Sequence, residues 1–166
     1  MSNITSANNE KIKIIGFGNV KMGDDGIGVR AIEEIQRIGL YESNGNIEII
    51  DGGTSGVDLV FMIQQADKAI IIDAVDAGQK TGEIVIFTPD RIKEFKKKKN
   101  GPRSFSLHDI DLSEVFELLK TLNIPVKIYI VGVKPEFVGY SDKLSQVVEK
   151  SIPDVISAVK QVVGSV

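Results

Sequence analysis

The chain has 166 residues, a formal net charge of −3 and no cysteine, so it can bury the core of one domain but cannot use thiolate metal sites or a cysteine nucleophile. Its single histidine, His108, excludes zinc sites that need two imidazoles. The mixed charge and the lack of a long apolar run predict a cytoplasmic protein that binds neither nucleic acid nor membranes.

The first part of the sequence alternates between strand and helix patterns. Residues 1–10 are polar and aperiodic, and we expect them to be a disordered tail before a single α/β domain over residues 11–166. Residues 11–17 form an apolar run that predicts a buried strand. Residues 26–39 carry one apolar stripe at helical spacing and end in a glycine, which predicts a helix.

The same alternation continues through the next forty residues. Residues 46–53 predict a second strand and residues 56–66 a short helix. Residues 68–78 predict a third strand, whose near-continuous isoleucine and valine content suits a sheet that is covered on both faces. Strands and helices that alternate in this way indicate a parallel sheet with right-handed crossovers.

The connection after the third strand changes the pattern. It is short and turn-like, so the strand at 82–89 is predicted to run antiparallel at an edge of the sheet. The remaining predicted elements are a helix at 111–123, a central strand at 126–136 and a helical segment at 141–163 that is interrupted near Pro153. The expected fold is a three-layer α/β/α sandwich with a twisted, mostly parallel five-stranded sheet carrying one antiparallel edge strand.

Three polar side chains are predicted to meet at one edge of this sheet. Sites in open parallel sheets form at the carboxyl ends of the strands, and Asp25 follows the first strand while Asp73 ends the third. The loop after the antiparallel strand must return to this edge before the next helix begins, which brings His108 beside the two acids. Two carboxylates and one imidazole make a site for a divalent cation, and imidazole favours nickel or zinc over magnesium.

Each of these residues also has a simpler interpretation. Asp24 and Asp25 are placed to cap the helix that follows them, since carboxylates favour the positive end of the helix dipole. Asp73 is placed to accept hydrogen bonds from loop amides, and a lone histidine is more often a surface or core residue than a ligand. Only the predicted convergence of Asp25, Asp73 and His108 favours a functional site.

The segment GFGNVKMGDDGIG, residues 16–28, also bears comparison with a dinucleotide-binding loop. Gly16 and Gly18 fit the G-x-G-x-x-G fingerprint, and Asp51 ends the second strand, where a ribose-binding acid is expected. The third glycine of the fingerprint is replaced by Lys21, and two aspartates bring negative charge to the position of the pyrophosphate. A nucleotide-binding Rossmann-like domain therefore stays as an alternative function that rests on a weak motif.

Five segments, in this order and spacing, carry a more specific signal: IIGFGNVKMGDDGIG, EIIDGGTSGVDLV, AIIIDAVDAG, SLHDIDLSEVFELL and IVGVKPE. Together they resemble the endopeptidases that mature nickel-iron hydrogenases, over nearly the whole chain. The resemblance implies an enzyme that removes a C-terminal extension from a hydrogenase large-subunit precursor after nickel insertion. It implies Asp25, Asp73 and His108 as the metal-binding and catalytic residues, with Asp25 standing where some members carry glutamate.

The resemblance also implies that nickel arrives with the precursor, where the three residues sense it, and that no residue binds a separate cofactor. Hydrolysis stays open between a metal-polarised water or carbonyl and a carboxylate general base. We expect a monomer whose partner is the precursor. A docking module that binds a nickel protein without cutting it is a further alternative. The basic run Lys96 to Lys99 is by default a solvated loop, although its position before His108 also suits contact with the precursor's tail.

Overall fold

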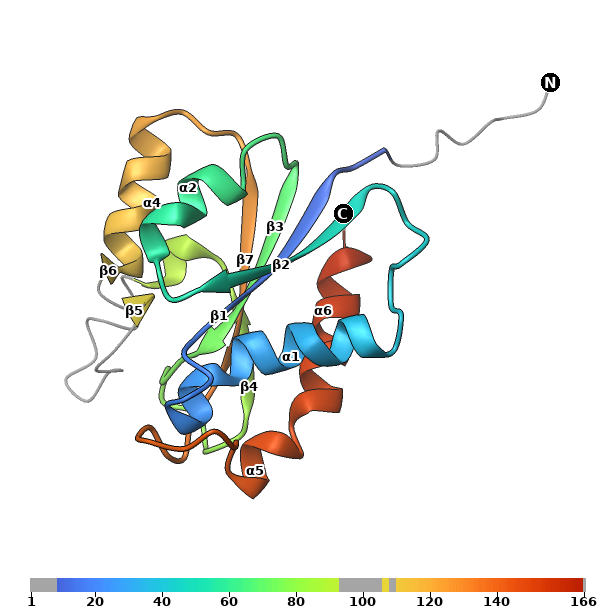
Figure 1. Cartoon of the computed structure of the whole chain (residues 1–166). Coiled ribbons are helices and arrows are strands. Elements are labelled where there is room, and N and C mark those ends of the chain that lie inside the picture. The colour runs from blue at the N-terminus through green and yellow to red at the C-terminus, as the bar shows by residue number, and fades with distance from the viewer. Residues whose placement is uncertain (1–8, 93–105, 108–109, 166) are drawn as a thin grey trace.

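The computed structural model describes residues 9–92, 106–107 and 110–165. These residues contain a five-stranded sheet in the order β2-β1-β3-β7-β4, as Figure 1 shows. The strands are β1 (Ile12–Phe17), β2 (Ile47–Gly53), β3 (Lys68–Ala74), β4 (Ile84–Phe87) and β7 (Lys127–Val133). All are parallel to their neighbours except β4, which pairs antiparallel with β7 at one edge. The predicted fold class is confirmed, including its antiparallel edge strand.

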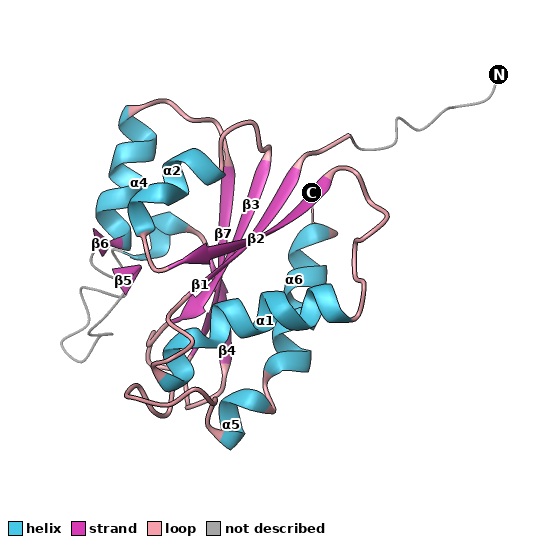
Figure 2. Cartoon of the chain, in the orientation of Figure 1, coloured by secondary structure: helices cyan, strands magenta, loops and turns pink. Residues whose placement is uncertain are grey.

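Helices cover both faces of the sheet, as Figure 2 shows. One face carries α1 (Ile27–Arg37) and α6 (Ile152–Val163), and the other carries α2 (Leu59–Met62) and α4 (Leu112–Thr121). Within the described residues, no helix combines the length and the apolar character needed to cross a bilayer.

The strands are buried because their side chains alternate between two apolar clusters. Ile70 belongs to the cluster under α1 and α6, whereas Ile71 belongs to the cluster under α2 and α4. Both side chains are fully buried, since β3 has a neighbouring strand on each side and helices above and below. The apolar run in the sequence thus reflects a strand with no polar face.

Several boundaries differ from the prediction. The segment expected to be one short helix is a 3₁₀ turn, η2 (Gly56–Asp58), followed by the single turn of α2. A small antiparallel pair, β5 (Ser106–Leu107) and β6 (Ile110–Asp111), was not predicted and delays the start of α4 by one residue. Strands of two residues are too short to produce a periodic pattern.

The closing helical segment is divided near Pro153, as predicted. It forms α5 (Gln146–Glu149) and then α6, and Pro153 lies in the first turn of α6. Proline is tolerated there because the first backbone N–H groups of a helix have no intrahelical acceptor. The break therefore comes just before the proline, at Lys150 and Ser151.

Candidate functional site

The two predicted carboxylates lie on elements that meet at the carboxyl edge of the sheet. Asp25 belongs to the 3₁₀ turn η1 (Gly23–Gly26), which joins β1 to α1 and contacts β3. Asp73 is the last but one residue of β3, and its side chain is buried. The structure thus confirms that both acids are at the predicted edge.

Asp25 is positioned by the loop that precedes it. The backbone N–H of Asn19 donates a hydrogen bond to Oδ2 of Asp25 at 3.0 Å. The loop folds back this closely because Gly18 has a φ of +143° and a Cβ there would lie 2.0 Å from the carbonyl oxygen of Asp25. Only glycine fits at position 18. Gly18 and Asn19 together thus hold the half-buried carboxylate of Asp25 in place.

Asp73 ends an otherwise apolar strand. Its Oδ1 accepts a hydrogen bond from the backbone N–H of Ala74 at 2.8 Å, so the loop-amide interpretation holds for one oxygen. By the alternation of the strand, Asp73 shares a face with Ile71 and Val75, which belong to the cluster under α2 and α4. Asp73 therefore lies on the same side of the sheet as α4.

His108 lies outside the described residues, and so does the basic run Lys96 to Lys99. The short strands on either side of His108 in the sequence, β5 and β6, lie where α4 begins (Figure 1). The side chains of the described residues contain no cluster of three or more acids or histidines suited to a metal ion. The convergence of His108 with Asp25 and Asp73 therefore stays a prediction.

Asp24 has a role that the sequence did not indicate. Its side chain is fully buried and accepts four hydrogen bonds from the segment after β7. The backbone N–H groups of Glu136 and Phe137 donate to Oδ2, and Ser145 donates its N–H to Oδ1 and its hydroxyl to Oδ2, at 2.7 to 3.0 Å. Asp24 lies in the first turn of η1, where a carboxylate favours the helix dipole, but these hydrogen bonds go to a remote loop and none of them caps the helix.

The glycine-rich loop already uses most of its backbone N–H groups within the protein. The N–H of Gly18 donates to the carbonyl of Gly53, and that of Asn19 donates to Asp25. The N–H groups of residues 21–25 also donate to acceptors within the protein. A pyrophosphate is held by amides of this kind only when they are unengaged, so the geometry argues against the nucleotide-binding alternative.

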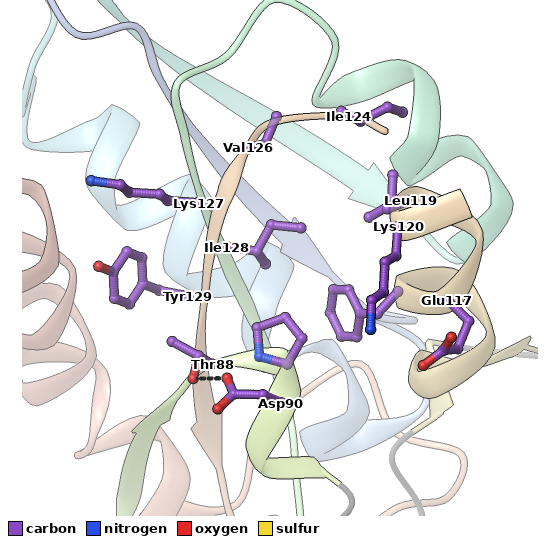
Figure 3. A pocket seen from close by; sticks show the side chains of 12 residues that line it. Thr88, Asp90, Glu117, Leu119, Lys120, Ile124, Val126, Lys127, Ile128 and Tyr129 are labelled. Carbon is purple, nitrogen blue, oxygen red and sulfur yellow. Dashed lines mark hydrogen bonds between the residues drawn. The ribbon is translucent and has the colours of Figure 1, made fainter. Parts of the chain in front are cut away.

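A pocket of about 560 Å³ lies beside the start of β7, away from the carboxyl edge of the sheet. Figure 3 shows the side chains that line it. Its walls include Lys127 and Tyr129 at the start of β7, Thr88 and Asp90 after β4, and Leu119 of α4. The carboxyl edge with Asp25 and Asp73 contributes none of the residues that line it. This pocket is therefore separate from the candidate site, which is identified by the carboxylates of Asp25 and Asp73 and not by a cavity.

One ion pair joins the loops after β3 and β7 at the same edge as the candidate site. Nζ of Lys134 lies 2.8 Å from Oδ1 of Asp76, which also accepts a hydrogen bond from the N–H of Gly78. The hydrogen bond from Lys134 lowers the pKa of Asp76 below its ordinary value of 3.8 and outweighs partial burial, which raises it. Asp76 is therefore ionised at neutral pH.

Comparison with known proteins decides the family. Residues 29–162 match the family model described as "HycI: Hydrogenase maturation protease", a range that includes Asp73 and His108 and begins just after Asp25. The chain belongs to the hydrogenase maturation protease family.

Individual members of the family agree with this assignment. The hydrogenase expression/formation protein HupD of Rhizobium leguminosarum is 30% identical over 93% of this chain and 75% of its own length. HupD of Bradyrhizobium diazoefficiens is 34% identical over 79% of this chain. This chain spans only 66% of the length of that relative. The hydrogenase 2 maturation protease of Escherichia coli is 28% identical, and the match covers 91% of this chain and 92% of that protein.

Solved structures from the same family share the fold. The hydrogenase maturating endopeptidase HybD from Escherichia coli superposes with a TM-score of 0.73 and 28% identity, covering 90% of this chain and 89% of that one. The [NiFe] hydrogenase maturation protease HybD from Thermococcus kodakarensis has a TM-score of 0.72 at 24% identity, which shows the fold alone. The likeness to these members of the family therefore extends over nearly the whole chain.

Proposed function

We propose that this member of the hydrogenase maturation protease family is an endopeptidase that removes the C-terminal extension of a hydrogenase large-subunit precursor after nickel insertion. The observation that carries the proposal is the placement of Asp25 and Asp73 on contacting elements at the carboxyl edge of the sheet. Membership of a protease family supplies the reaction class. The nickel belongs to the precursor, so it enters the reaction as part of the substrate.

The two carboxylates suit a site that inspects a metal rather than one that stores it. Asp25 already accepts a hydrogen bond from Asn19, and Asp73 accepts one from Ala74, so each carboxylate has part of its acceptor capacity engaged by the protein. Carboxylate oxygens and the imidazole of His108 would complete the coordination of a nickel ion that the precursor already holds. The metal would supply Lewis-acid polarisation at the bond to be cut.

The protein's own residues have defined tasks in this proposal. Asp25 or Asp73 holds the attacking water as a general base, a role for which a carboxylate must lie within hydrogen-bond reach of that water. Asn19 orients Asp25 through its backbone N–H. Asp24 keeps the turn that carries Asp25 attached to the segment after β7.

The test is intact-mass analysis of a hydrogenase large-subunit precursor incubated with the protein, with and without nickel loading. We expect loss of a C-terminal fragment from the nickel-loaded precursor only. Asp25→Asn and Asp73→Asn should each slow cleavage, and the variant that removes the general base should slow it roughly 100-fold or more.

Asp51→Asn is the matched control. Asp51 is an exposed acid at the carboxyl end of β2, and its Oδ1 accepts a hydrogen bond from Gly53 that the asparagine amide oxygen preserves. Cleavage by Asp51→Asn should equal that of the unmodified protein. If the precursor binds but no fragment is released under any loading, the non-cleaving docking module is the better description.

A further inference from the structure

A loop beside the candidate site exposes three large apolar side chains. In the segment after β7, Phe137 is 51% exposed, Val138 is 55% exposed and Tyr140 is 93% exposed. Single exposed apolar residues are common on any protein, but three within four positions form a cluster. We call residues 136–140 the rim loop.

The rim loop is held firmly to η1. The N–H of Asp24 donates to the carbonyl of Phe137 at 2.9 Å, and the buried carboxylate of Asp24 accepts the N–H groups of Glu136 and Phe137. At the far end of the loop, the N–H of Gly23 donates to the carbonyl of Ser141 at 2.9 Å. These hydrogen bonds order the backbone of the rim loop before any partner binds. Binding to its exposed side chains therefore costs little further conformational entropy.

Two glycines also fix the ring of Phe137. A Cβ at Gly139 would lie 2.7 Å from Cζ of Phe137, and a Cβ at Gly23 would lie 3.0 Å from its Cδ1. The ring thus lies close over both glycines while half of its surface stays open. An aromatic side chain held in this way is the kind of rigid anchor that dominates protein–protein interfaces.

The rim loop is continuous with the candidate site. Asp24, which holds the loop, is the neighbour in sequence of Asp25, the candidate site residue. Figure 1 shows the segment between β7 and α5 beside the turn that precedes α1. The rim loop is therefore bonded to the same turn that carries Asp25.

We propose that the rim loop docks the hydrogenase precursor through an apolar segment that flanks the bond to be cut. The inference rests on the proposed function, because it assigns the surface that the same substrate uses. The charged neighbours of the cluster have both signs, with Glu136 and Asp142 against Lys143, so the surface has no strong attraction for nucleic acid or anionic lipid. An apolar, uncharged stretch of polypeptide fits it best.

The variant that tests the proposal is Val138→Ser/Tyr140→Ser, which removes two exposed side chains and leaves the hydrogen bonds of Asp24 in place. The matched control is Leu118→Ser/Leu122→Ser, since these side chains at the end of α4 are 45% and 53% exposed and lie near the start of β7, at the opposite edge of the sheet. Both variants should keep the melting temperature of the unmodified protein, because neither removes a buried group.

Steady-state cleavage of the nickel-loaded precursor gives the main readout. We expect the rim-loop variant to raise KM roughly 10- to 100-fold, the range for removing anchor side chains, with kcat unchanged within about twofold. The control should leave both constants unchanged. An unchanged KM, or a fall in kcat alone, would overturn the proposal.

Two further results separate this inference from the proposed function. If the unmodified protein cuts no precursor, the proposed function fails. Equilibrium binding to the nickel-free precursor then tests the docking surface. Weaker binding by the rim-loop variant alone would support docking at the rim loop, and equal binding would overturn it. Sedimentation of the unmodified protein gives the second result. A dimer that the rim-loop variant converts to monomer would assign the loop to self-association and overturn docking of the precursor.

Discussion

Each end of the sheet contains a fully buried charged side chain, and the two side chains hold different parts of the chain together. At the carboxyl edge, Asp24 accepts hydrogen bonds from Glu136, Phe137 and Ser145. At the opposite edge, Nζ of Lys68 donates to the carbonyls of Val162 and Ser165 at 3.1 and 2.6 Å. Lys68 also lies 3.5 Å from a carboxylate oxygen of Glu10.

The difference shows how the same physical requirement serves two purposes. A buried charge must be surrounded by partners, so each of these side chains fixes segments that are far apart in sequence. Lys68 fixes the end of α6, where a positive charge also favours the helix dipole, and Glu10 in the segment before β1. Asp24 instead fixes the rim loop to the turn that carries Asp25, so its bonds shape the candidate site.

Asp24→Ala should have the largest effect on stability, about 3 kcal/mol of unfolding free energy at neutral pH, because several donors lose a charged acceptor at once. Chemical denaturation measures that loss. In the folded fraction at low temperature, kcat/KM for precursor cleavage should also fall, because both the rim loop and Asp25 lose their anchor. Asp24→Asn, which keeps one acceptor oxygen, should recover part of both quantities.

A loss of stability without any change in kcat/KM would remove the difference between Asp24 and Lys68. Asp24 would then be a structural residue of the same kind as Lys68. A proportional recovery of stability and kcat/KM in Asp24→Asn would instead show that Asp24 positions the rim loop and Asp25. A residue that acts on stability alone leaves the kinetics of the folded molecules unchanged.

Lys68→Met should cost less, about 2 kcal/mol of unfolding free energy, because methionine fills the buried space while Ser165 and Glu10 lose a cationic partner. Urea denaturation of the two proteins measures the difference. Cleavage by the folded variant should keep the kcat and KM of the unmodified protein, since Lys68 is at the edge of the sheet remote from Asp25. A changed KM would show that the two edges are coupled.

Much of the fold was predictable because it depends on local patterns. The buried strand β3 follows from an apolar run, and the antiparallel β4 follows from a connection too short for a crossover helix. The edge that holds Asp25 and Asp73 then follows from topology alone. The direction of each strand in the large sheet was therefore accessible from the sequence, even though the pair β5 and β6 was not.

The partners of buried charges were not predictable in the same way. Asp24 and Ser145 are 121 positions apart, and Lys68 and Ser165 are 97 apart, so no local pattern connects them. The sequence indicated only that Asp24 is placed to cap the helix that follows it. Lys68 resembled an ordinary first residue of a strand, and its burial results from the way α6 ends over it.

The smallest predicted effect concerns Asp76, a partly exposed acid at the same edge as Asp24. The pair with Lys134 is 24% and 39% exposed at its two side chains, so solvent screening limits its contribution to under about 1 kcal/mol. Because the folded-state pKa of Asp76 is lowered below 3.8, the unfolded chain binds a proton at higher pH than the folded protein does. The contribution is therefore complete above 3.8 and is lost as the pH falls through the folded-state pKa.

Asp76→Asn should consequently lower the unfolding free energy slightly at pH 7, and the difference from the unmodified protein should vanish in strong acid. Denaturation curves at several pH values measure both. Precursor cleavage should stay unchanged, since the pair joins two loops without anchoring Asp25. A large loss of cleavage would instead place Asp76 within the site, and it would show that a residue can shape this edge without a hydrogen bond to the turn that carries Asp25.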